Sequence, residues 1–166
     1  MGFTALDGLP MGTRTGAIDS GVLLYLQRQG MSLDALEQML YQESGLLGMS
    51  GLSSDMRVLL ASEAPAARHA VDVFVWRIVQ SLGAMAASLG GLDALVFTAG
   101  IGEHAAEIRA RVCQAAAWMG IALDTQANDQ HARCISRAES AVSVWVIPTD
   151  EDAMIAEHTR KMIDSV

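Results

Sequence analysis

The sequence has little positive charge. It contains a single lysine, Lys161, and ten arginines against nineteen acidic residues, which gives a formal charge of −8. A protein that binds nucleic acid non-specifically needs a field of lysine and arginine to displace counterions from the phosphates. A helix that binds a membrane surface needs a basic face. The composition therefore argues against both classes, and we expect neither a nucleic-acid partner nor a membrane partner.

Targeting segments and paired cysteines are also missing. The two cysteines, Cys113 and Cys134, do not form a CxxC pair. The N-terminal segment MGFTALDG has no basic start followed by an apolar run, as a signal peptide would. The most apolar region, residues 71–92, is interrupted by Asp72 and Arg77, so it is not the uninterrupted run of a membrane span. These absences predict a cytoplasmic protein with reduced thiols.

Apolar residues, in contrast, are abundant. They make up 51% of the 166 residues, charged residues make up 18%, and the mean hydropathy is +0.29. A chain of this length and composition can fill a hydrophobic core. We therefore expect one domain, or one domain with a small appendage.

The first half of the sequence has helical periodicity in three segments. Asp19 and Ser20 can cap a helix that ends near Gly30, and Ser32 begins a second helix in the segment SLDALEQMLYQE. Apolar residues at three- and four-residue spacing predict a long helix over residues 65–89. Between the second and third helices, the segment GLLGMSGLSSD has three glycines and three serines in eleven residues. That composition predicts a loop.

The second half alternates strand and helix patterns. The run DALVFTAG is continuously apolar and bounded by turn residues, which is typical of a strand covered on both faces of a parallel sheet. It leads through the glycine turn AGIGEH into a predicted helix over residues 105–119. A second buried-type strand, VSVWVIP, precedes a last helix over residues 150–163. This βαβα order predicts a helix-rich α/β fold.

The ends of the two predicted strands are the first places to look for a ligand, because open α/β sheets bind ligands beyond their strand carboxyl ends. At the first end, Gly100 and Gly102 would let the backbone approach a ligand, and the free amides of the next helix would offer an anion site. A glycine pair that only makes the bend explains the pattern equally well. Glu103 is similarly ambiguous, because an acid in a first helical turn also favours the helix dipole.

The second strand end carries the segment VIPTDEDAM. Here Thr149 is predicted to cap the last helix, with Asp152 as its reciprocal partner. That arrangement leaves Asp150 and Glu151 without a structural task. A carboxylate at this position could hold Mg²⁺ directly or through water, so Glu151 is a candidate metal ligand.

Two further candidates lie nearer the N-terminus. Arg14 lies between glycines in the segment MGTRTG, where its planar fork could clamp a phosphate or a carboxylate; a solvated surface arginine is the alternative. Asp55 and Arg57 follow the glycine-serine segment, and a simple helix start at Asp55 is the alternative there.

Four stretches of this sequence, in order and spread over nearly the whole chain, resemble the C-terminal part of the acetokinase family. They are MGFTALDGLPMGTRTGAID, SGLLGMSGLSSDMR, LGGLDALVFTAGIGEHAAEIR and VIPTDEDAMIAEHTR. The resemblance implies the C-terminal domain of the actin-like ATPase (ribonuclease H-like) fold. Residues 1–166 would then form a C-terminal nucleotide-binding domain without an N-terminal domain. It also implies a homodimer that transfers phosphate between ATP and acetate with Mg²⁺.

The resemblance also implies roles for individual residues. Arg14 matches the arginine that contacts the acetate or the transferred phosphoryl group and stabilises the transition state, and Glu151 matches the carboxylate associated with Mg²⁺. Residues implied to contact ATP or ADP fall into two groups. The adenosine pocket would include Asp55, Met56 and Arg57, and the GIGEN nucleotide loop would be Gly100, Ile101, Gly102, Glu103 and His104. His104 replaces the usual asparagine of that loop, and we expect it to tune nucleotide contact without abolishing it.

Motifs of the family's N-terminal half do not occur in this sequence. Neither its Asn-x-Gly-Ser segment nor its His-x-Gly-Asn-Gly loop is present, and Met1 falls on a methionine inside the family's SMGFT stretch. We therefore expect a C-terminal fragment that is inactive alone. The alternatives are a non-catalytic module for nucleotide binding or dimerisation, and one chain of a split kinase with a separate N-terminal half. Acetate, propionate and butyrate all remain open as the acyl partner.

Overall fold

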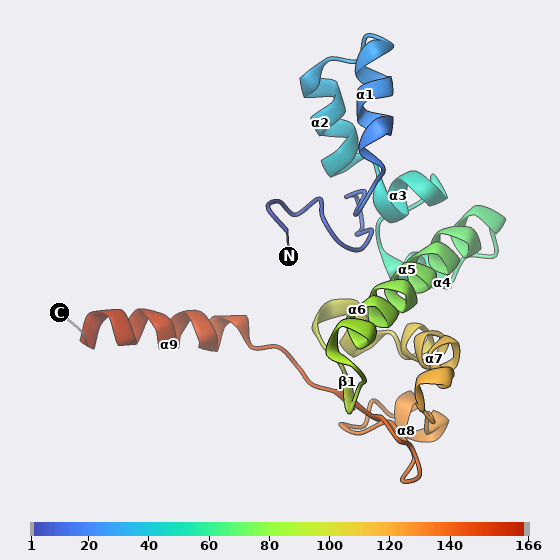
Figure 1. Ribbon diagram of the computed structural model, residues 1–166, viewed down its shortest axis with the longest axis vertical. Coiled ribbons are helices and arrows are strands. Elements are labelled where there is room, and N and C mark those ends of the chain that lie inside the picture. Colours follow the sequence, from blue (N-terminus) through green and yellow to red (C-terminus); the bar gives the residue numbers. More distant parts are fainter. Residues whose placement is uncertain (1, 165–166) are drawn as a thin grey trace. The chain divides into compact units, whose positions relative to one another are not determined.

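The computed structural model describes residues 2–164 and divides into two compact units, Met1–Gly91 and Leu92–Val166 (Figure 1). The first unit is entirely helical in its regular structure. Its elements are α1 (Ser20–Arg28), α2 (Leu33–Gln42), α3 (Gly45–Ser50), α4 (Met56–Leu60) and α5 (Pro65–Leu89). The second unit combines helices with a small sheet. Its elements are β1 (Ala94–Phe97), α6 (Ala99–His104), α7 (Ala106–Ala115), the 3-10 turn η1 (Ala117–Met119), α8 (Thr125–Asp129), β2 (Ser143–Val146) and α9 (Glu151–Asp164).

The starts of the first two helices follow their capping residues. A carboxylate oxygen of Asp19 accepts from the backbone N–H of Gly21 at 2.7 Å, and the hydroxyl oxygen of Ser32 accepts from that of Ala35 at 3.2 Å. Each side chain satisfies an amide that the helix itself cannot pair. The two predicted helices are confirmed.

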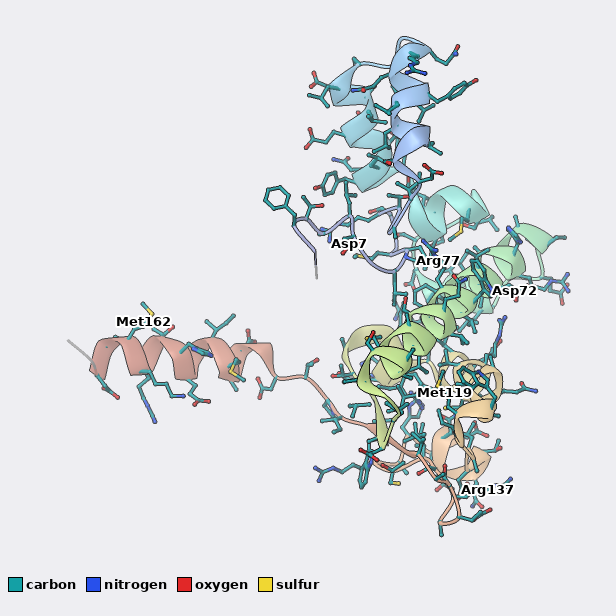
Figure 2. All side chains as sticks on the ribbon, in the orientation of Figure 1. Asp7, Asp72, Arg77, Met119, Arg137 and Met162 are labelled. Atoms are coloured by element: carbon teal, nitrogen blue, oxygen red, sulfur yellow. The ribbon has the colours of Figure 1, made fainter. Side chains whose placement is uncertain are left out.

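The long helix α5 organises the first unit. It has Pro65 at its first turn and ends at Gly90, which has a φ of +78°. Six of its side chains are buried (Ala67, Ala70, Val71, Phe74, Val75 and Leu82), and α3 and α4 pack against it. Arg77, labelled in Figure 2, donates from α5 to the carbonyl of Ala17 and so ties the N-terminal segment to the helix. By length and composition α5 could cross a membrane, a test that buried core helices also pass.

The composition of the glycine- and serine-rich segment after α2 predicts a loop, and this prediction is wrong for part of the segment. Residues Gly45–Ser50 form α3. Leu46 of this helix is fully buried, and burying a leucine side chain is worth roughly 1.5–3 kcal/mol. That gain exceeds the roughly 1 kcal/mol by which a helical glycine is disfavoured, so packing against α5 overrides the local preference.

In the second unit, β1 and β2 form a parallel two-stranded sheet in which Ala94 is opposite Ser143 and Phe97 is opposite Val146. The parallel pairing and the helix-rich α/β class are confirmed. The prediction that the first strand is covered on both faces is wrong, because Ala94 is exposed and Val96 is 47% exposed. The core lies instead around β2 and α7. It includes Ile108, Val112, Ile135, Val142, Val144 and Val146.

The segment after β1 also differs from the prediction. The expected glycine turn AGIGEH is the short helix α6, and the expected single helix over residues 105–119 is divided into α7 and η1. The backbone breaks at Ala105, whose φ of −105° and ψ of 84° are not helical. This break lets α6 and α7 take different directions, and the residues of α6 remain beyond the carboxyl end of β1.

Two glycines that flank α3 allow a test of this packing. Gly45 and Gly51 have nearly the same left-handed backbone, with φ of +59° and +61°. A Cβ at Gly45 would collide with the carbonyl oxygens of Met11 and Arg14, whereas a Cβ at Gly51 meets no heavy atom within 4 Å. Gly51→Ala should cost about 1–2 kcal/mol of unfolding free energy for the left-handed residue. Gly45→Ala should cost about 1–3 kcal/mol more because of the collision.

Chemical denaturation of the two variants and of the wild type measures this difference. Equal losses of stability at the two positions would contradict the close approach of residues 11–14 to α3.

Candidate functional site

Backbone hydrogen bonds fix the loop that carries Arg14. Amide groups at the start of α3 donate to this loop: Ser44 N–H to the carbonyl of Thr13, and Leu46 N–H to that of Met11, both at 2.9 Å. The hydroxyl of Thr13 donates to the carbonyl of Tyr41 at 2.8 Å. The loop is therefore attached to the end of α2 and the start of α3, and the backbone of Arg14 is positioned by two helices.

The side chain of Arg14 is exposed. Its contact within the chain is weak, a distance of 3.8 Å from Nη1 to the sulfur of Met11. The residue lines a cavity of about 660 Å³ together with Thr13, Asp34, Glu37, Gln38, Tyr41 and Gln42. No carboxylate among the described residues is hydrogen-bonded to this guanidinium, so it has donors available for an anionic ligand.

The second predicted group, residues 55–57, lies in the same unit. Asp55 caps α4, and its carboxylate also pairs with the guanidinium of Arg57, at 2.6 Å from Oδ2 to Nη2. This hydrogen bond lowers the pKa of Asp55. Met56 points into the core and is 4% exposed. A Cβ on Gly12 would lie 3.1 Å from the carbonyl oxygen of Ser54, so the Arg14 loop passes next to the segment that leads into Asp55.

The third predicted group, residues 100–104, forms α6 in the second unit. The helix begins at Ala99, whose φ of +58° is unusual for a residue with a side chain; backbone strain of this kind is frequent at functional sites. Gly100 is exposed, does not have a positive φ, and has no heavy atom within 4 Å of an added Cβ. Neither backbone conformation nor packing within the described chain therefore requires a glycine at this position. Open space above a glycine is what close approach of a ligand needs.

A hydrogen-bonded link joins the two loops at the carboxyl ends of the strands. The backbone N–H and the hydroxyl of Thr149 both donate to Oε1 of Glu103, at 3.0 and 3.1 Å. The N–H donor of Thr149 is the main reason that the pKa of Glu103 is lowered. The predicted cap by Thr149 with Asp152 is therefore wrong: Asp150 accepts from the N–H of Ala153 at 2.8 Å instead.

Arg109 is a site residue that the sequence reasoning missed. It is fully buried in α7, and its guanidinium donates to the carbonyls of Gly102 and Glu103 beneath α6. Burial lowers its pKa. The signal was an arginine on the buried face of α7 that also carries Ile108 and Val112. Arginine is almost never fully buried without partners, so its position in that apolar pattern indicated a polar network.

Metal ligands are few in the described part of the chain. No group of three or more His, Cys, Asp or Glu side chains is positioned there to hold an ion. Glu151 is the first residue of α9, and its side chain lies outside the described residues. Protein sites for Mg²⁺ often supply one or two carboxylates and leave the remaining positions to substrate phosphates and water. Oδ1 of Asp150 accepts from the N–H of Ala153. Its other carboxylate oxygen, Oδ2, could serve as one ligand of such a site.

The predicted site residues therefore fall into two sets. Arg14 and residues 55–57 lie in the first unit, and residues 100–104 lie in the second unit with Thr149, Asp150 and the start of α9. Within the second unit, the two strand-end loops are brought together by Glu103 and Thr149.

The link between Glu103 and Thr149 should be sensitive to acid. The pKa of Glu103 is lowered in the folded protein, and the pKa of a free glutamate is about 4.3. The stabilisation is therefore complete above that pH and is lost as the pH falls through the lower folded pKa. NMR should show the amide proton of Thr149 titrating in this range. Glu103→Gln should abolish the titration and Glu107→Gln should preserve it; a Thr149 amide insensitive to Glu103→Gln would contradict the link.

Comparison with known proteins accords with this geometry. The sequence profile of the acetokinase family matches residues 1–157. The acetate kinase of Rhodopseudomonas palustris (strain TIE-1) is 59% identical over 167 residues, which cover 99% of this chain and 42% of that protein. The acetate kinase of Rickettsia felis is 48% identical, with 98% and 43% covered. This chain thus spans about two fifths of the length of these relatives.

Solved structures agree in fold. The Porphyromonas gingivalis acetate kinase superposes with a TM-score of 0.91 at 39% identity, covering 98% of this chain and 43% of that chain. A propionate kinase from Francisella tularensis superposes with a TM-score of 0.87, also at 39% identity, covering 94% and 41%. The family profile, the sequence identities and the shared fold lead to one conclusion: this chain belongs to the acetokinase family.

Proposed function

We propose that this chain binds ADP or ATP, together with Mg²⁺, at α6 and the start of α9. We further propose that it supplies the C-terminal part of an active site that transfers phosphate between ATP and acetate or another short-chain carboxylate. The observation that carries the proposal is the open face of Gly100 at the carboxyl end of a parallel strand, in a chain whose relatives are named acetate kinases. Residues 100–104 would form the nucleotide loop of the second unit. For the first unit, we propose only that Asp55, Met56 and Arg57 contact adenosine, as the family resemblance implies.

The roles of the charged residues follow from the chemistry of phosphoryl transfer. Its transition state spreads negative charge over three equatorial oxygens, so catalysis is largely positioning and charge stabilisation. The exposed guanidinium of Arg14, with its backbone held by α2 and α3, can donate two parallel hydrogen bonds to such oxygens. Bound Mg²⁺ would neutralise phosphate charge, with Glu151 as the proposed carboxylate and Asp150 beside it.

The first test is nucleotide binding by the 166-residue chain, measured by calorimetric titration with MgADP. Gly100→Leu places a side chain at an exposed position where an added Cβ meets no heavy atom within 4 Å, so we expect the thermal stability to stay unchanged. It should weaken MgADP binding by at least about tenfold, since a blocked ligand contact worth 1.4 kcal/mol is a factor of ten. Ala138→Leu, also exposed in the second unit, is the matched control and should bind normally.

Absence of any binding by the wild type, even at millimolar MgADP, would reject the nucleotide site. Equal affinities of the wild type and Gly100→Leu would reject its location at α6.

Catalysis by the chain alone is a separate question. The Asn-x-Gly-Ser and His-x-Gly-Asn-Gly motifs of the family do not occur in the sequence, and we propose that the remaining charge stabilisation is too small for turnover. Trapping acetyl phosphate as the hydroxamate should therefore detect little or no product from ATP and acetate. Robust product formation by the purified chain would contradict this. A gain of activity on adding a separate N-terminal half would support the split-kinase alternative.

An assembly role is the second candidate, and the exposed apolar side chains of α5 favour it. Met85 and Leu89 are one turn apart on this helix and are 56% and 75% exposed. Neighbouring exposed apolar residues indicate a surface for association. We propose that this surface contributes to a homodimer of a cytoplasmic protein.

A further inference from the structure

The guanidinium of Arg109 donates four hydrogen bonds to oxygen atoms beneath α6 and has a fifth neighbour in His131. Nη1 donates to the carbonyls of Gly102 and Glu103 at 3.0 and 2.7 Å. Nε donates to the side-chain oxygen of Asn128 at 2.8 Å, and Nη2 donates to the carbonyl of the same residue at 2.9 Å. Nδ1 of His131 lies 3.2 Å from Nη2 and accepts from it when that nitrogen carries no proton. None of these hydrogen-bond partners is a carboxylate.

Burying a guanidinium in this way is energetically unfavourable compared with burying an apolar side chain. Removing a charge from water costs several kcal/mol, and a carboxylate partner in good geometry is the usual compensation. Here the compensation comes from oriented carbonyl dipoles, two of which belong to the last turn of α6. The negative end of a helix favours a cation, so the charge of Arg109 and the path of the α6 backbone are coupled.

The same short helix is held from a second side. Glu103 is fixed through its carbonyl by Arg109 and through its carboxylate by Thr149. Asn128 in turn donates from Nδ2 to the carbonyl of Ala106, at the start of α7. The end of α6 is thus attached to α7, to α8 and to the segment before α9, whereas Gly100 at its beginning faces open space.

We propose that Arg109 is a positioning residue for nucleotide binding: from within the core it holds the carbonyls of residues 102 and 103, so that α6 keeps one fixed orientation at the strand end. The inference rests on the proposed nucleotide site at α6, because Arg109 itself is buried and cannot touch the ligand. Preorganised groups bind without having to be ordered by the ligand. Loosening α6 should therefore weaken binding even though every residue facing the ligand is unchanged.

Three variants separate positioning from simple loss of stability. Arg109→Met removes all five donors, while Arg109→Lys keeps a charge and can still donate to the α6 carbonyls. Val112→Ala is the control, since Val112 is fully buried in the same helix and its truncation lowers stability without removing a hydrogen bond to α6. His131→Ala removes an exposed ring whose Nδ1 lies 3.2 Å from Nη2 of Arg109 and 3.1 Å from the Glu103 carbonyl oxygen, and which bonds one or the other according to its tautomer.

Two readouts are measured on the full chain: hydrogen exchange of the amides of residues 102–105, and MgADP affinity by calorimetry. Arg109→Met should accelerate the exchange and weaken binding by at least about tenfold, and Arg109→Lys should have intermediate effects. His131→Ala should weaken binding by about threefold. Val112→Ala should lower the thermal midpoint and leave both readouts at wild-type values.

Several results would overturn the inference. These are unchanged exchange in both Arg109→Lys and His131→Ala, faster exchange with undiminished affinity, or an equal loss of affinity in Val112→Ala. If Arg109→Met fails to fold, Arg109→Lys and His131→Ala still decide the outcome. A wild-type chain that does not bind MgADP would refute the proposed function and the ligand part of this inference together. The exchange data would still show whether Arg109 holds α6.

Discussion

The parallel pairing of β1 with β2 is the constraint on which the second unit depends. Ala94 is opposite Ser143 and Phe97 opposite Val146, and the N–H of Ile147 continues the ladder to the carbonyl of Phe97 at 2.9 Å. Two parallel strands end at the same edge of their sheet, so the segments that follow them must leave from the same place. This is why α6 and the segment before α9 are neighbours. Glu103 and Thr149, which link them, are 46 residues apart in the sequence.

Two kinds of interaction then convert this proximity into a defined geometry. On the solvent side, the Glu103 carboxylate accepts both donors of Thr149. On the core side, the guanidinium of Arg109 donates to carbonyl oxygens at the end of α6, and none of its hydrogen bonds within the described residues goes to a carboxylate. The buried charge makes any displacement of these carbonyls costly. The loop that we propose to bind nucleotide is therefore rigid at its end and open at Gly100.

Much of the architecture could be predicted from local signals in the sequence. Asp19 and Ser32 cap helices because their side chains satisfy nearby amides, and Pro65 and Gly90 delimit α5 for equally local reasons. The family of the chain could be predicted because four specific stretches occur in order. The position of Arg14 among glycines likewise indicated an arginine available to an anion, but the anchors of its loop on α2 and α3 come from distant parts of the chain and were not predicted.

The features that escaped prediction depend on tertiary contacts. The helix α3 forms because Leu46 is buried against α5, contrary to the preference of its glycines. Thr149 does not cap α9 because Glu103, in another loop, takes its hydroxyl. Val96 is exposed although its strand has a fully apolar pattern, because the described chain places no element over that side chain. Arg109 was visible as an unusual residue in the apolar pattern of α7, but its four partner residues come from α6, α8 and the turn after α8.

The central claim is that the two strand-end loops of the second unit form one nucleotide site. Backbone amide NMR during titration of the chain with MgADP tests it most directly, because each residue reports separately. The account predicts saturable shifts of residues 99–104 together with Thr149 and Asp150, at one common affinity. Shifts confined to other segments, or no shifts in either loop, would contradict it.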